Sequence, residues 1–231
     1  MEHEVKKQPQ SGIRISLQVP SQDPEIYKNK ATNDILLFLS RHRFDEFSVS
    51  EIATQTGNTK PTVGRAVDVL RSNDLVVEEP GGNQRLVRIN RDHLSVPDDP
   101  ILQIPQSEFH KPVKAAVDEL TETIDNTLGI LLYGSVARGE ADRRSDIDLW
   151  VLVSEDRAAG QRAANRVARE LEEREFESGR YAYDIDVEDV SSIPMYTEDI
   201  REIVLAGIPV HKKSDFETVE RLLMNEVERD E

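Results

Sequence analysis

Hydrophobic residues in the first half of the chain follow two different periods. They recur at helical spacing over residues 27–42 and 59–70, and residues 48–57 fit a short helix with a serine cap and a closing glycine. Alternating apolar residues then predict two strands, 75–78 and 85–89, joined by a glycine-containing turn. The order of these patterns predicts three helices followed by a β-hairpin.

This order resembles the winged helix-turn-helix domains of transcription regulators, and we expect such a domain over residues 25–95. In these domains the third helix enters the major groove of DNA and the hairpin reaches the phosphate backbone. The resemblance therefore implies DNA contacts from Lys60, Thr62 and Arg65 on the helix and from Arg85 on the hairpin. Basic and acidic side chains are equal in number here, 13 of each before residue 96. A docking module for a protein partner therefore stays open as a second interpretation.

The second half of the chain begins with an amphipathic helix near Glu108, on whose surface we expect His110. A continuous apolar run at 128–133 predicts a buried strand that ends in the turn Gly134-Ser135. The remaining elements are predicted from their periods: a strand around 147–151, a long helix at 157–177, a strand at 180–190, a helix at 200–207 and a short strand to residue 211.

The turn at Gly134-Ser135 and the acidic pair that follows it predict a phosphate and metal site. Without a Cβ, Gly134 lets a phosphate approach the backbone closely, and the Ser135 hydroxyl can donate a hydrogen bond to it. Asp146 and Asp148 are two residues apart, so on a strand they point to the same face. Two carboxylates this close repel each other unless a cation lies between them, and Mg²⁺ with a triphosphate as co-ligand suits such oxygen ligands.

A third carboxylate is predicted on the strand at 180–190. Asp184, Asp186 and Glu188 alternate with apolar residues, so they share one face. A two-metal phosphoryl transfer needs one further carboxylate beside the acceptor, and we expect one of these three to supply it.

The charge of the chain changes near its middle. Residues 96–231 carry 16 basic and 32 acidic side chains, which accounts for the whole formal net charge of -16. We therefore expect a linker at 96–106 and a second domain at 107–213, with a flexible or short-stranded arm at 1–24 and an acidic helix at 214–231. Such an acidic surface is typical of a halophile. The chain has no cysteine and no apolar run long enough to span a bilayer, so we expect a cytoplasmic protein with no membrane partner.

The motif Gly-Ser-x-Ala-Arg-Gly at 134–139, followed by Ser-Asp-x-Asp-Leu at 145–149, resembles the signature of the DNA polymerase beta-like nucleotidyltransferases, specifically their minimal branch. The resemblance implies an enzyme that moves a nucleoside monophosphate, AMP from ATP in the first instance, onto an acceptor hydroxyl with two Mg²⁺ ions. The residues it implies are Asp146, Asp148 and Asp186 for catalysis and metal binding, with Asp184 in reserve, and Gly134, Ser135 and Arg138 for the nucleotide.

The expected fold class is α+β with two domains, a winged helix-turn-helix followed by a polymerase beta-like α/β domain with a mixed sheet. Three functions stay open. The first is a protein nucleotidyltransferase similar to the minimal antitoxins that adenylylate a tyrosine of a HEPN-type toxin, with the winged helix docking DNA or a partner. The second is a DNA-binding transcription regulator that only senses nucleotide, and the third is a small-molecule nucleotidyltransferase of the aminoglycoside type. Since winged helices often pair, a homodimer is the default expectation.

Overall fold

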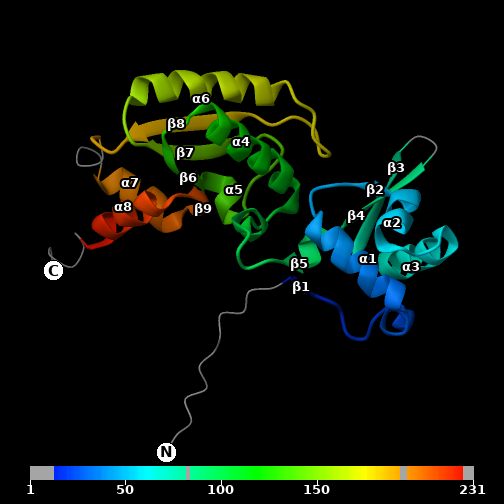
Figure 1. Cartoon of the computed structure of the whole chain (residues 1–231). Helices are drawn as coiled ribbons and strands as arrows, with labels where there is room; N and C mark the ends of the chain where they lie inside the picture. The colour runs from blue at the N-terminus through cyan, green and yellow to red at the C-terminus, as the bar shows by residue number, and fades with distance from the viewer. Residues whose placement is uncertain (1–12, 82–83, 193–196, 226–231) are drawn as a thin grey trace, which may run out of the picture. The chain divides into compact units, whose positions relative to one another are not determined.

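The computed structural model describes residues 13–81, 84–192 and 197–225 (Figure 1). They fall into two compact units that divide between Asp98 and Asp99. Each unit has its own buried apolar core, and each is described separately below. Among the described residues, no helix has the length and apolar character needed to cross a membrane.

Three helices form the body of the first unit: α1 (Lys30–Arg41), α2 (Val49–Thr56) and α3 (Lys60–Ser72). Helix α2 begins with a capping box, in which Ser48 accepts from the backbone of Glu51 while the Glu51 side chain accepts from that of Ser48. It ends at Gly57, which has the left-handed φ of 70° that favours glycine. Apolar side chains from all three helices bury together: Ile35, Leu39, Ile52, Val63, Val67 and Leu70.

The hairpin follows α3 and consists of β3 (Val76–Gly81) and β4 (Gln84–Ile89). The short strand β2 (Phe47–Ser48), which the sequence pattern did not predict, pairs with β4 to give a sheet of order β2-β4-β3. The N-terminal arm contributes a two-residue strand, β1 (Arg14–Ile15), which pairs with β5 (Leu94–Ser95). This is the predicted winged helix-turn-helix arrangement of three helices and a hairpin.

The second unit is built on one four-stranded mixed sheet. Its strands are β6 (Thr127–Tyr133), β7 (Ile147–Val153), β8 (Tyr183–Asp189) and β9 (Ile208–Lys212). The order across the sheet is β8-β7-β6-β9, with β7 and β8 parallel and the other pairs antiparallel. The predicted mixed sheet is therefore confirmed.

Helices cover both faces of this sheet (Figure 1). Helices α4 (His110–Thr123) and α6 (Arg157–Glu172) lie on one face, and α7 (Thr197–Ala206) and α8 (Ser214–Asn225) lie on the other. The acidic helix expected at 214–231 thus docks on its own domain through Phe216, which is fully buried against Trp150 and Leu131. Residues 226–231 of the expected helix lie outside the described residues.

The segment expected to be a linker, residues 96–106, is folded into the second unit from Asp99 onward. It contains the 3-10 helix η3 (Pro100–Gln103), and Ile101 and Ile104 are buried. A second 3-10 helix, η4 (Ser107–Phe109), leads directly into α4.

This folded segment also explains why the expectation for His110 was wrong. His110 is buried, and its Nε2 lies 2.9 Å from the carbonyl oxygen of Ile104. The segment before α4 covers the first turn of the helix, and the amphipathic pattern of the helix alone did not indicate this cover.

Candidate functional site

Carboxylates gather where β7 begins, on the sheet face that carries α7 and α8. Side chains alternate along β7, so Asp148 shares this face with Trp150 and Leu152, which pack in the α8 core. Asp148 is half-buried at the edge of that core. Asp146 directly precedes the strand and is exposed to solvent.

The register of the sheet brings the acidic residues of β8 to the same face. Asp148 pairs with Asp184 on one side and with Tyr133 of β6 on the other. Trp150, two residues further along β7, pairs with Asp186. Asp184 and Asp186 are both exposed, so the structure places Asp148, Asp184 and Asp186 on one face with Asp146 beside them.

The Gly134-Ser135 turn lies directly against this group. Gly134 has φ +68° and begins the short helix α5 (Gly134–Arg138). A Cβ added at Gly134 would lie 2.9 Å from Cγ of Asp148, with Oδ2 nearer still, so only glycine fits between the turn and the carboxylate. Ser135 is half-buried, and its hydroxyl has no hydrogen-bond partner within the described part of the chain.

The electrostatics of the site show carboxylates that are close enough to repel each other. Burial raises the pKa of Asp148, and the charges of Asp184 and Asp146 raise it further, while the Arg138 guanidinium opposes the shift. The pKa of Asp184 is likewise raised, first by burial and then by Asp186 and Asp146. Arg138 offsets only part of this negative charge, because it is exposed and its Nε also pairs with Glu140 at 2.8 Å.

A divalent cation fits this donor set. Carboxylate oxygens are hard ligands of the kind that Mg²⁺ binds, and a cation among them would remove their mutual repulsion. As the side chains stand, no group of three or more acidic or histidine residues in the described ranges is drawn together closely enough to hold a metal ion. The site therefore offers the ligands on one face, and the side chains would have to move to enclose an ion.

Tyr133 was not singled out from the sequence, yet it belongs to this site. Its hydroxyl lies 3.4 Å from Oδ2 of Asp186. Burial raises its pKa, with further contributions from Asp186, Asp148 and Asp184, so it stays a neutral hydrogen-bond donor. The available sequence signal was its place at the end of the strand before Gly134, but the register of β6 against β7 was needed to use it.

The residues expected to contact DNA have different environments in the first unit. Lys60 and Arg65 are exposed on the N-terminal half of α3, and Thr62 is half-buried, with its hydroxyl 2.8 Å from that of Thr59. Arg85 is exposed but paired, since it contacts Glu78 and lies 2.9 Å from Asp68. These two carboxylates compete with a phosphate for Arg85.

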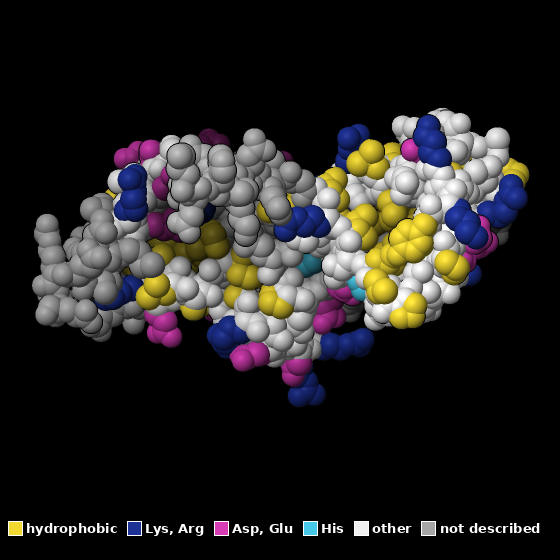
Figure 2. All heavy atoms as spheres, turned by 90° about the horizontal axis from the view of Figure 1, so that it is seen from below, with side chains coloured by type: hydrophobic (Ala, Val, Ile, Leu, Met, Phe, Trp, Pro, Cys, Tyr) yellow, Lys and Arg dark blue, Asp and Glu magenta, His cyan; other side chains and the backbone are white. Residues whose placement is uncertain are grey.

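On the face of the molecule seen in Figure 2, small groups of Lys and Arg side chains are interspersed with Asp and Glu side chains. DNA that contacted this face would therefore meet a few local cations rather than a broad basic surface.

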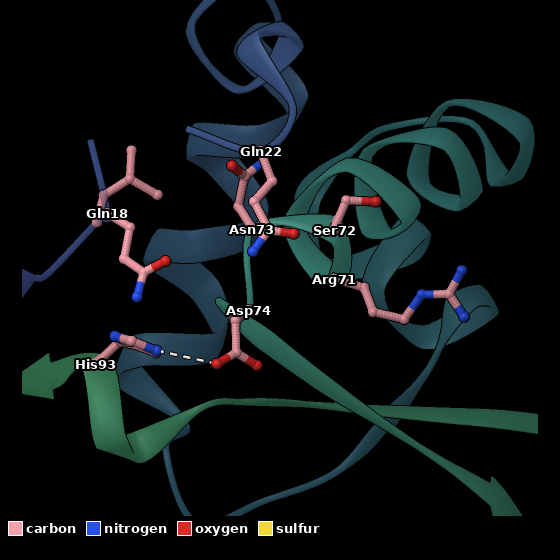
Figure 3. A pocket seen from close by; sticks show the side chains of 8 residues that line it. Gln18, Gln22, Arg71, Ser72, Asn73, Asp74 and His93 are labelled. Atoms are coloured by element: carbon pink, nitrogen blue, oxygen red, sulfur yellow. Dashed lines mark hydrogen bonds and ion pairs between the residues drawn. The ribbon is translucent and has the colours of Figure 1, made fainter. Parts of the chain in front are cut away.

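A polar cavity of about 340 Å³ lies at the C-terminal end of α3, in the first unit (Figure 3). Asp74 and His93 face each other in it, 3.2 Å apart, and Asn73 fixes the N-terminal arm by hydrogen bonds to the backbone of Asp23. The polar residues that line this cavity therefore have a structural role, because their contacts hold the N-terminal arm against α3.

One family model matches most of the second unit. The model of the family "Polymerase beta, Nucleotidyltransferase" matches residues 116–216. None of the curated proteins compared with the chain matches it.

Three solved structures are each similar to a part of the chain. A mutant of the toxin-antitoxin MntA-HpeT is 20% identical, with a TM-score of 0.38, and the match covers 51% of this chain and 87% of that one. A toxin-antitoxin structure with AMP-PNP is 22% identical, with a TM-score of 0.38 and coverage of 49% and 86%. A homodimeric winged helix-turn-helix DNA-binding domain from Mycobacterium bovis is 24% identical, with a TM-score of 0.27 and coverage of 41% and 74%.

The family match spans β6, the Gly134-Ser135 turn, the strands β7 and β8 that carry the carboxylates, and the start of α8. It contains every residue of the site described above and confirms the resemblance drawn from the two motifs. Residues 116–216 of this chain match the model of the polymerase beta nucleotidyltransferase family.

Proposed function

We propose that the second unit transfers a nucleoside monophosphate, AMP from ATP, onto a hydroxyl group of a protein, with two Mg²⁺ ions bound by Asp146, Asp148 and Asp186. The observation that supports this proposal is the placement of the acidic residues of β7 and β8 on one sheet face, against the Gly134-Ser135 turn. The bound ions would neutralise phosphate charge and lower the pKa of the acceptor hydroxyl.

The side chains of the site have separate tasks in this proposal. The backbone at Gly134 and the free hydroxyl of Ser135 bind the phosphates of the nucleotide. Arg138, whose charge already acts on Asp148, balances part of the negative charge that nucleotide and carboxylates bring together. Asp186 accepts the proton of the attacking hydroxyl, whose oxygen bonds to the α-phosphorus as pyrophosphate leaves.

A protein is the acceptor we favour because the acidic face is open. Asp146, Asp184 and Asp186 are exposed, so a hydroxyl presented on another macromolecule has access to them. A HEPN-type toxin, the partner that the resemblance to the minimal nucleotidyltransferases suggests, is the first acceptor to test.

The first unit has a docking role in this proposal. Lys60 and Arg65 are exposed at the start of α3, the helix that enters the major groove in winged-helix domains. We propose that these two residues and Thr62 contact DNA, and that Arg85 supports the hairpin through Asp68 and Glu78 unless DNA phosphates displace those carboxylates.

The test is incubation of the full chain with ATP labelled at the α-phosphate, Mg²⁺ and an extract of the source cells. The proposal predicts label on a protein, and loss of that label in Asp146→Asn and Asp148→Asn. ATP that binds but is not converted would instead favour a nucleotide-sensing regulator. Label on a small molecule would favour an enzyme of the aminoglycoside-modifying type.

A further inference from the structure

The site contains two candidates for the third carboxylate, and their surroundings differ. Asp184 lies directly opposite Asp148 in the β7–β8 register, while Asp186 lies two pairs further along, opposite Trp150. Within the described part of the chain, Asp184 has no hydrogen-bond partner, whereas Asp186 has the hydroxyl of Tyr133.

Tyr133 reaches Asp186 across the strand between them. It stands at the end of β6, in the row of the sheet that contains Asp148 and Asp184, and its hydroxyl contacts a residue of the neighbouring row on β8. The side chain is half-buried and packs against the cluster that contains Leu131 and Trp150. This packing fixes the aromatic ring, so the position of the hydroxyl is fixed as well.

We propose that Tyr133 is a positioning residue of the transfer site, whose hydroxyl donates to Asp186 and thereby selects this carboxylate, rather than Asp184, as the third metal ligand. The inference rests on the proposed function, because it assumes that the carboxylates bind metal. Hydrogen bonds from outer residues orient metal-binding carboxylates, and their loss typically weakens metal affinity by about 10- to 100-fold. We expect the lower end of that range, since a single hydrogen bond of 3.4 Å is removed.

The experiment is a titration of the full chain with Mn²⁺, in which the electron paramagnetic resonance signal of the free ion measures how much Mn²⁺ stays unbound. Tyr133→Phe removes the hydroxyl and keeps the ring, and its Mn²⁺ affinity should fall by about tenfold. Tyr181→Phe is the matched control, because Tyr181 is also half-buried in the second unit, but its hydroxyl donates to the backbone carbonyl of Glu108 at 3.3 Å. The Mn²⁺ affinity of Tyr181→Phe should equal that of the wild type.

Double variants separate positioning of Asp186 from a general effect on structure. Tyr133→Phe should add no further loss to Asp186→Asn, whereas in Asp184→Asn it should still cost about tenfold. An unchanged Mn²⁺ affinity of Tyr133→Phe, or an equal loss in both double variants, would overturn the inference. If Tyr133→Phe does not fold, the single variants decide, since the inference requires Asp186→Asn to weaken binding more than Asp184→Asn.

The same titration distinguishes failure of this inference from failure of the proposed function. A wild-type protein that binds no Mn²⁺, with or without ATP, overturns both. Binding that Asp146→Asn and Asp148→Asn abolish, but that Tyr133→Phe leaves unchanged, overturns the role of Tyr133 alone.

Discussion

Replacing Gly134 by alanine tests the geometry of the site with one methyl group. A left-handed residue with a Cβ costs about 1–2 kcal/mol, and Gly134 has φ +68°. The added Cβ would also lie 2.9 Å from Cγ of Asp148, with Oδ2 nearer still. The carboxylate must therefore move, and a displacement on the order of 1 Å at a reacting group costs roughly a hundredfold in rate. We expect Gly134→Ala to transfer α-phosphate label from ATP at about one hundredth of the wild-type rate or less.

Gly57→Ala is the matched control. Gly57 has nearly the same conformation, φ +70°, but no atom lies within 4 Å of an added Cβ, and the residue is in the first unit. Calorimetry should show a similar backbone cost, of about 1–2 kcal/mol, in the unfolding of that unit, with label transfer unchanged. Label transfer by Gly134→Ala within about threefold of the wild-type rate would refute the reasoning, because it would mean that Asp148 need not stay where the structure places it.

Three further predictions follow from the structure. Phe216→Ala should lower the free energy of unfolding of the second unit by about 3–5 kcal/mol in urea denaturation. Trp150, the single tryptophan, reports the transition by its fluorescence, because its ring centroid lies 6.4 Å from that of Phe216. A loss below about 1 kcal/mol would contradict the docking of α8. The double variant Lys60→Glu with Arg65→Glu should reduce the slope of log DNA affinity against log salt by about 2, and an unchanged slope would mean that these cations touch no phosphate. Asp186→Asn should abolish label transfer while Asp184→Asn reduces it less, and the reverse order would make Asp184 the third carboxylate.

The faces of the acidic strands could be predicted from the sequence because a strand has a period of two. Asp146 and Asp148 are two residues apart, and so are Asp184 and Asp186, so the two members of each pair are expected on the same side of an extended chain. This expectation does not depend on the rest of the fold. The end of β6 could also be predicted, since Gly134 follows an apolar run directly. Local pattern was therefore sufficient for the two halves of the candidate site.

The contacts between these halves could not be predicted, because they depend on strand order and register. Tyr133 reaches Asp186 only because β7 lies between β6 and β8 and pairs with both. The pairing of Arg85 with Asp68 likewise joins residues 17 positions apart in the chain. Periodicity indicates which way a side chain points, but it does not identify the neighbour that the side chain meets.

The central claim is that Asp146, Asp148 and Asp186 bind divalent metal ions beside the Gly134-Ser135 turn. Crystals grown with Mn²⁺ and a non-hydrolysable ATP analogue test it most directly, because anomalous scattering locates the metal without reference to a model. The account predicts anomalous peaks within coordination distance of these three carboxylates and of the nucleotide phosphates. Peaks elsewhere, or a nucleotide bound away from the turn with no metal at these carboxylates, would contradict it.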